Sequence, residues 1–292
     1  MNGQFAFLAD IERDITLLQT QAQTVNEVQT QATSIQSALG IVQSQTSDLA
    51  EAFALASTTL SPSNRNAVSR ESEATLGSIV SALNTTVAGR SLFSGTDVTT
   101  LPFSGADEIL AGLTAAVAGA TTASDILVAA DAYFDTPGGG FESDLYMGGT
   151  TDLSAVDLGS GETVALDVRA DNTVLRTVVK SVAIGALLED LSTVLDGAQQ
   201  QQLTESLAER TLTSQDSVTR LRADLGFAEE RIAAALTRTA TEIQAADIAR
   251  GTLLDIDPFK VATDLEAVQI QLEMLYTITA RSSRLSLVNF IS

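Results

Sequence analysis

Residues 257–292 have the pattern of one amphipathic helix whose apolar positions continue almost to the last residue. Apolar side chains recur there at alternating steps of four and three, the spacing that places them on one helix face. We call this set the C-terminal seam: Val261, Leu265, Val268, Leu272, Leu275, Leu285, Leu287 and Phe290, with Ile278 or Thr279 in the gap. Chain ends usually fray because nothing ties them down, so a terminus this apolar predicts burial against another surface.

A second long helical pattern occupies residues 2–61, at the other end of the chain. Its heptad run slips once, by two consecutive steps of three, a stammer that locally overwinds a coiled coil. The apolar positions are Leu8, Ile11, Ile15, Leu18, Ala22, Val25, Val28, Ala32, Ile35, Leu39 and Val42. Ser61 and Pro62 end the pattern, and a further helix is predicted over 63–88, stopping at Gly89.

The middle of the chain, residues 97–171, differs from both flanks. It holds thirteen Asp and Glu residues against one basic residue, Arg169. A short helix is predicted at 124–134, and alternating apolar positions predict strands at 153–158 and 163–169, joined as a hairpin. The acidic side chains are interpreted as a solvated surface. A cation site is the minor alternative, built from Asp152, Asp157 and Asp167, because calcium prefers oxygen ligands, although no EF-hand spacing is present.

Helical pattern returns near Asn172 and continues with little interruption to Asp255, with a seam at Val218, Leu221, Leu225, Ala228, Ile232, Ala235 and Thr239. Asp257 is predicted to cap the last helix, with Pro258 in its first turn. Lys180, isolated in this stretch, is expected at the surface. The predicted fold class is mainly α with a small β-containing insertion, an elongated antiparallel helical rod with a hairpin or irregular tip.

Three parts follow from this pattern. Residues 1–96 plus 172–256 are predicted to form a helical rod domain, 97–171 an acidic β-containing outer insertion, and 257–292 a C-terminal assembly helix. Helical ends that pack on each other would bring the termini together and place the middle at the far end.

The composition of the chain argues against several classes of function. The net charge of −21 and pI of about 4.1 argue against nucleic acid, whose binding requires Lys and Arg to neutralise phosphates. The chain has no cysteine and no histidine, which removes thiol nucleophiles and the commonest general base and metal ligand. We therefore expect neither an enzyme nor a cofactor or metal. No apolar run is long enough for a membrane span, and no cleavable signal peptide is visible at the start.

Two sequence segments resemble the flagellin superfamily. The segment LNTTVAGRSLFSG is similar to the exit from the second helix of hook-filament junction proteins, through Gly89, Arg90, Leu92, Phe93, Ser94 and Gly95. The closing segment resembles the C-terminal helix of flagellins and junction proteins, through Leu275, Ser283, Leu285, Ser286, Leu287 and Phe290. Long helices at both ends of a variable β-containing middle are a third point of likeness.

The resemblance implies a secreted structural subunit of the bacterial flagellum, exported through the flagellar secretion channel. It favours the junction protein between hook and filament, with flagellin as the alternative. The implied partners are other copies, the neighbouring axial proteins on the hook and filament sides, and an export chaperone. The family begins with about forty residues that find no match here, and the apolar helix within them would pair with the C-terminal helix.

The C-terminal seam has two interpretations. One is a coil within the molecule, and the other is a surface buried between subunits. Residues 258–292 contain three acidic and three basic residues, so they are neutral in a strongly acidic chain, which favours the intersubunit interpretation. A coiled-coil adaptor is the alternative of another class, but the first arm is rich in Gln and Thr and lacks the regular charge pairs of such a protein.

Overall fold

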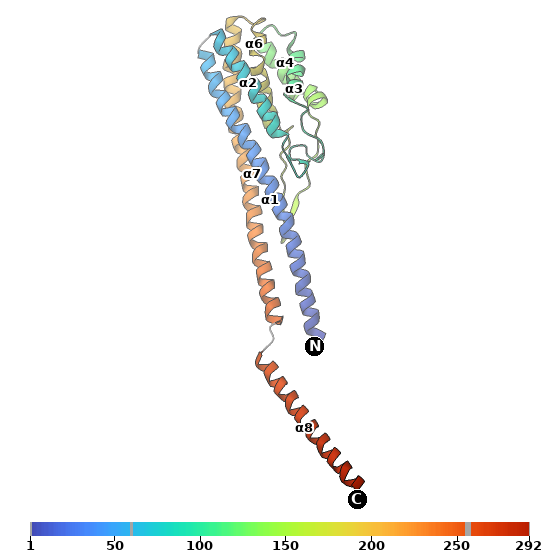
Figure 1. Ribbon diagram of the computed structural model, residues 1–292. Coiled ribbons are helices and arrows are strands. Elements are labelled where there is room, and N and C mark those ends of the chain that lie inside the picture. The colour runs from blue at the N-terminus through green and yellow to red at the C-terminus, as the bar shows by residue number, and fades with distance from the viewer. Residues whose placement is uncertain (1, 59–60, 255–257, 292) are drawn as a thin grey trace. The chain divides into compact units, whose positions relative to one another are not determined.

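The computed structural model describes residues 2–58, 61–254 and 258–291, without the side chains of 2–5, 62, 258, 260 and 283–291. Three helices account for most of it: α1 (Asn2–Thr58), α7 (Gly197–Leu254) and α8 (Pro258–Ile291) (Figure 1). The chain forms two compact units, one of Met1–Thr20 with Ala240–Ser292 and one of Gln21–Thr239. The predicted cap Asp257 lies outside the described residues.

Within the larger unit, α1 and α7 run antiparallel and side by side. Their apolar seams are buried as predicted, including Val25, Ile35 and Leu39 on α1 and Val218, Leu225 and Ile232 on α7. Side-chain hydrogen bonds between the helices show that they are antiparallel. Gln215 donates to Ser47 at 3.1 Å, and Gln36 donates to the main-chain oxygen of Arg222 at 3.1 Å. The polar Gln and Thr positions therefore supply hydrogen bonds between α1 and α7.

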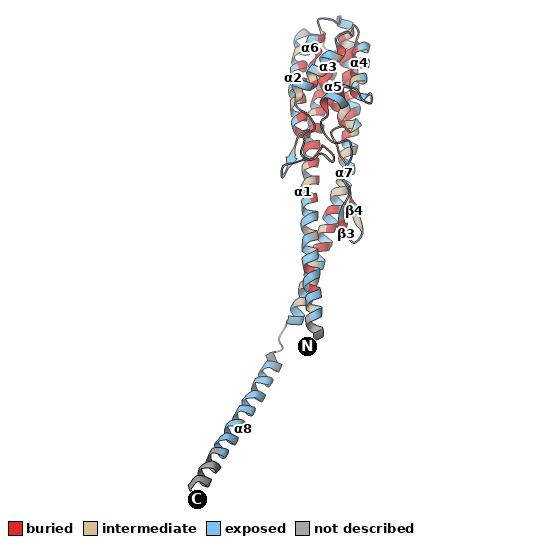
Figure 2. Cartoon of the chain, turned by 90° about the vertical axis from the view of Figure 1, so that its right-hand side faces the viewer, coloured by how far each residue is buried: buried red, intermediate tan, exposed pale blue. Residues whose placement is uncertain are grey.

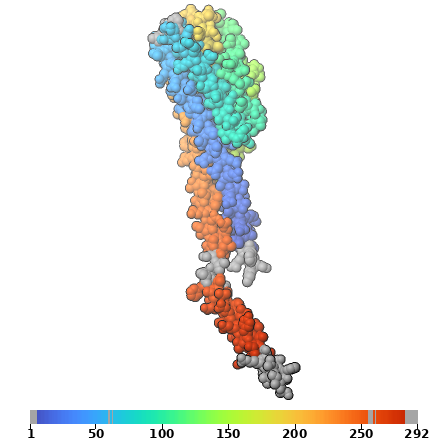
Figure 3. Space-filling model, in the orientation of Figure 1, coloured from blue at the N-terminus to red at the C-terminus, as the bar shows by residue number. Residues whose placement is uncertain are grey.

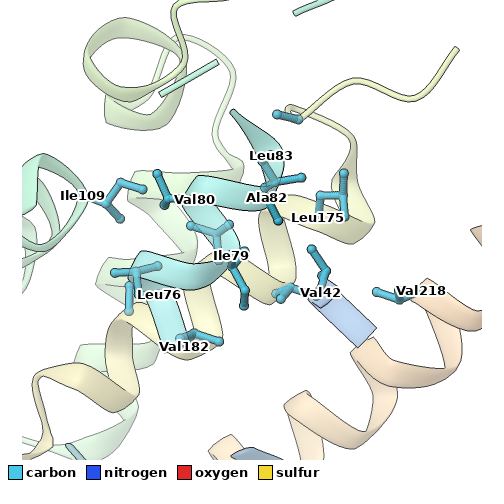
Figure 4. Packing of buried hydrophobic residues seen from close by; sticks show 14 of the residues in the cluster. Val42, Leu76, Ile79, Val80, Ala82, Leu83, Ile109, Leu175, Val182 and Val218 are labelled. Atoms are coloured by element: carbon cyan, nitrogen blue, oxygen red, sulfur yellow. The ribbon is translucent and has the colours of Figure 1, made fainter. Parts of the chain in front are cut away.

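Four more helices pack on this pair and complete one continuous core. They are α2 (Pro62–Leu83), α3 (Ala106–Val117), α4 (Ala123–Asp135) and α5 (Thr173–Ala186). Figure 4 shows buried residues of these helices close together: Val42 of α1, Val218 of α7, Leu76, Ile79 and Val80 of α2, Ile109 of α3, and Leu175 and Val182 of α5. In the space-filling view, α1, α2 and the segments after them form an unbroken surface (Figure 3).

The α2 helix stops at Leu83, earlier than the sequence predicted. Asn84 ends it, because its side chain accepts from the main-chain nitrogen of Phe103 at 3.1 Å and donates to the main-chain oxygen of that residue at 2.8 Å. The following residues make a tight hairpin, β1 (Thr86–Val87) and β2 (Arg90–Ser91). Ala88 and Gly89 turn it with φ of 50° and 76°, the left-handed pair that such two-residue turns require.

The predicted second hairpin is present but shorter, formed by β3 (Val156–Gly159) and β4 (Glu162–Val164). It lies against the long helices, because Gln21 of α1 donates to the main-chain oxygen of Leu158 at 2.7 Å. On the other side, Arg231 and Arg238 of α7 bind the Glu162 carboxylate at 3.0 and 3.2 Å. These hydrogen bonds, that of Arg231 first, lower the pKa of Glu162.

The stretch after Asn172 is helical as predicted, and Asn172 caps α5 by accepting from the Val174 nitrogen at 2.9 Å. It is interrupted more than expected: α5 is followed by the single turn α6 (Leu188–Leu191) before α7 begins. A five-residue π-helical turn, η1 (Phe141–Leu145), follows the glycine cluster. The predicted fold class is confirmed: the described chain is mainly helical, with two small hairpins.

Lys180 is not at the surface as predicted. Its side chain is 4 % exposed and binds Asp131 at 2.7 Å and also Asp135, both on α4. Arg210 of α7 holds Asp131 from the other side through two hydrogen bonds of 2.8 and 2.9 Å. Burial raises the pKa of Asp131, but the hydrogen bonds from Arg210 and Lys180 outweigh it and lower the pKa to about 2. The network joins α4, α5 and α7.

Candidate assembly surface

The C-terminal seam is exposed on α8 over its whole described length. The exposed fractions are 50 % at Val261, 59 % at Leu265, 52 % at Val268, 49 % at Leu272 and 63 % at Leu275. Figure 2 shows this contrast with the larger unit, where the buried positions of α1 and α7 line up along each helix. Leu285, Leu287 and Phe290 have side chains outside the described part of the chain. An apolar surface this extended marks an interaction site.

Sequence reasoning missed a second apolar row on α8. Ile270, Met274 and Ile278 follow one another at steps of four and are 54 %, 61 % and 67 % exposed. We call them the opposite ridge. Their i, i+4 spacing is visible in the sequence. The sequence analysis nevertheless considered Ile278 as a residue of the seam, because the seam is the more regular pattern. Thr279 instead continues the seam, four positions after Leu275.

Four of the six residues of the family motif, Leu92, Phe93, Ser94 and Gly95, are buried, in contrast to the seam. Leu92 and Phe93 are buried in the main core, and the Phe93 main-chain oxygen accepts from the Ala170 nitrogen at 2.9 Å. Gly89 lies in the turn of the first hairpin, and Arg90 is exposed on β2. The motif thus connects the end of α2 to the segment that leads into α5.

Ser94 and Gly95 form the tightest part of this connection. The Ser94 hydroxyl contacts that of Ser91 at 2.8 Å and donates to the main-chain oxygen of Thr100 at 2.6 Å. Gly95 has a φ of 57°, and a Cβ built on it would stand 2.4 Å from the main-chain oxygen of Thr151. Only glycine fits this position without displacement. The motif therefore serves to connect segments within the fold. It lies in one compact unit, and the seam lies in the other.

Two of the three acidic residues considered for a cation site, Asp152 and Asp157, have other partners. Asp152 binds Arg169 at 2.5 Å, and Asp157 accepts from the Gly159 nitrogen at 2.8 Å. In the described residues, no group of three or more His, Cys, Asp or Glu is placed to hold a metal ion. A groove of about 340 Å³ between α5 and α7 is lined by Thr177, Thr213, Ser214 and Arg210 among others. The three hydroxyls donate to their own helices, and the Arg210 guanidinium is bound by Asp131.

Residues 210–291 match the family of bacterial flagellin C-terminal helical regions. The end of the chain is therefore similar to a flagellin C-terminal region. This matched region includes α7 from Arg210 onward and all of α8, and therefore the C-terminal seam and the opposite ridge. The superfamily that the sequence resembled is confirmed.

Two solved structures share the flagellin-like fold over most of their length. A flagellar hook-associated protein of Vibrio parahaemolyticus is 15 % identical with a TM-score of 0.57, over 85 % of this chain and 96 % of that one. FlgL of Bacillus cereus is also 15 % identical, with a TM-score of 0.58, over 81 % of this chain and 96 % of that one. No curated protein sequence matches the chain.

Across the helices that the structure describes, none is both long and apolar enough to cross a bilayer.

Proposed function

We propose that this chain is a structural subunit of the bacterial flagellum that joins hook and filament by polymerising through its terminal helices. The observation that carries the proposal is the flagellin C-terminal region at residues 210–291, whose last helix exposes its apolar seam. The likeness of the fold to 96 % of two hook-associated chains supports the junction position.

Polymerisation requires only the burial of the seam, at Val261, Leu265, Val268, Leu272 and Leu275 and, further along, Leu285, Leu287 and Phe290. At roughly 25 cal/mol per Å², several hundred Å² of buried apolar surface contribute on the order of 10 kcal/mol before ordering costs. That is enough to hold a subunit in a lattice. No covalent chemistry and no cofactor are needed.

The proposal includes an arrangement of parts. Residues 1–96 plus 172–256 form the rod, 97–171 the outward-facing acidic insertion, and 257–292 the assembly helix. The partners are other copies and the axial proteins on the hook and filament sides, with an export chaperone before assembly. The location is the extracellular flagellum, reached through the flagellar secretion channel.

A filament subunit is the second candidate, because the matched region is named for flagellin itself. Deleting the gene in its source bacterium separates the two. A junction subunit leaves hooks in place, abolishes filaments and releases the separate flagellin into the medium. A filament subunit also abolishes filaments, but no filament protein is released. Normal filaments on normal hooks would contradict both.

A further inference from the structure

The hairpin of β3 and β4 lies across α1 and α7 near one end of the larger unit. That unit begins at Gln21 of α1 and ends at Thr239 of α7. The hairpin contacts α1 at Gln21 and α7 at Arg231 and Arg238. Figure 2 shows β3 and β4 beside α7, well away from α2 and α6. The hairpin is therefore placed to hold this end of the two long helices together.

On the α1 side, the contact is made by main-chain atoms of the hairpin. The Gln21 side chain donates to the main-chain oxygen of Leu158 at 2.7 Å. Gly159 has a φ of 87°, and a Cβ built on it would overlap with the Gln21 side-chain nitrogen. Glycine therefore lets the hairpin lie directly against Gln21.

On the α7 side, the contact depends on charge. Arg231 and Arg238 bind the Glu162 carboxylate at 3.0 and 3.2 Å, and Arg231 also donates to the main-chain oxygen of Thr163 at 2.6 Å. The Glu162 side chain is 30 % exposed, and the side chains of the two arginines are 49 % and 36 % exposed. Because water and ions reach these groups, dissolved salt weakens their attraction.

Apolar side chains are buried at the same level of the long helices. Val25 follows Gln21 by one turn of α1, Ile232 lies between the two arginines of α7, and both are fully buried. Leu158 and Val164 of the hairpin belong to the same buried cluster. Detachment of the hairpin would therefore expose part of both seams to water.

The hairpin has little stability of its own. β3 has four residues and β4 has three, and an isolated two-stranded hairpin is marginally stable at best in water. It stays in place through its contacts with α1 and α7, whereas the core around Val42 and Val218 is packed with α2 and α5 instead.

We propose that β3 and β4 form a detachable strap. The contacts of Glu162 with α7 hold this end of the α1–α7 pair closed, and their loss opens it while the rest of the larger unit stays folded. Local opening of this kind is drawn from the least stable parts of a fold. The inference does not depend on the proposed function.

Hydrogen exchange of the full chain at pH 7, read by mass spectrometry, tests the strap. Glu162→Gln removes its charge, and Glu230→Gln is the matched control, because it removes the same charge from an exposed position of α7. We expect amides of 156–164 and 228–239 to exchange about fivefold faster in Glu162→Gln, as the loss of partly exposed ion pairs predicts. Amides of 175–185 in α5 should exchange at unchanged rates, and the control should match the unmodified chain throughout.

Salt supplies a second measurement that needs no substitution. Raising NaCl from about 0.05 M to about 1 M shortens the range of charge interactions to about 3 Å. We expect this change to accelerate exchange of 156–164 in the unmodified chain and to have little effect in Glu162→Gln.

Any of four outcomes would overturn the inference. Unchanged exchange of 156–164 in Glu162→Gln, or a salt effect equally large in that variant, would mean that the Glu162 charge does not hold the strap. Equal acceleration of 175–185 would mean that the hairpin and the helices open as one cooperative unit. Equal acceleration in Glu230→Gln would assign the effect to net charge. Polymer formation is not measured in these experiments, so the proposed function stands or fails separately.

Discussion

The helices α7 and α8 have the same kind of apolar seam and opposite surroundings. On α7, Val218, Leu225 and Ile232 are at most 4 % exposed, whereas Val261 and Leu265 on α8 are 50 % and 59 % exposed. The first seam is covered by α1 of the same chain. The difference shows that periodicity identifies a surface to be covered without identifying what covers it.

Charge explains how two similar patterns are used differently. On α7 the seam is flanked by Arg222, Arg231 and Arg238, which bind side chains or main-chain atoms of α1 and the second hairpin. On α8, Thr263, Thr277 and Thr279 donate hydrogen bonds to main-chain oxygens of the same helix. Specific polar partners fix α7 within its own molecule. A neutral helix such as α8 remains available to another molecule.

The largest expected effect comes from placing one charge in each seam. Leu225→Glu on α7 buries an unpaired carboxylate among apolar side chains, which costs several kcal/mol and should unfold the larger unit. Leu265→Glu on α8 should leave the melting temperature unchanged and abolish polymer formation. Thermal circular dichroism and sedimentation measure the two outcomes. If Leu265→Glu lowered the melting temperature of the monomer, the seam would be packed within the molecule.

Hydrogen exchange on the monomer should reproduce the same contrast without any substitution. Amides of α7 between 211 and 239 lie in the buried coil, and we expect them to exchange at least ~1,000-fold more slowly than unstructured peptide. Amides of 258–282 on α8 should exchange within about tenfold of the unstructured rate, because most helical stability comes from tertiary packing. Strong protection of α8 in a confirmed monomer would mean that assembly is not what orders it.

The sequence predicted the long helices because their apolar spacing is regular over many turns. It missed α3, whose buried residues Ile109, Leu113 and Val117 lie in a segment rich in small residues. It also extended α2 to Ala88, with Gly89 as its stop, and these two residues are equally suited to a helix end and to a hairpin turn. Both errors concern short elements whose conformation is decided by tertiary contacts.

Among the site residues, the sequence predicted the seam and missed the opposite ridge and the buried position of Lys180. A lone lysine gives no local signal for burial, since its partner Asp135 is 45 residues away in sequence. The fold supplies that partner by packing α4 on α5. Long-range ion pairs of this kind cannot be read from periodicity.

A smaller effect is expected inside the family motif. Gly95→Ala puts a methyl group 2.4 Å from the Thr151 oxygen at a φ of 57°. Left-handed strain and the clash together should lower the free energy of unfolding by about 2–4 kcal/mol. Gly89→Ala is the matched control, because its φ is 76° but nothing lies within 4 Å; it should cost about 1 kcal/mol. Equal losses in urea denaturation would show that crowding at Gly95 is relieved by movement.

The smallest effect concerns the ion pairs of the larger unit. The pKa of Asp131 falls from 3.8 to about 2 on folding, so this carboxylate stabilises the fold above pH 4, and the contribution is lost as the pH falls towards 2. Since Asp131 is 37 % exposed, solvent screening reduces the effect to about 1 kcal/mol. Asp131→Asn should therefore lower the free energy of unfolding by that amount at pH 7 and by progressively less below pH 4. Asp216→Asn, at an exposed position of α7, should have little effect at either pH. A deficit in Asp131→Asn that persists unchanged at pH 2.5 in urea denaturation would assign the loss to packing rather than to the charge held by Lys180 and Arg210.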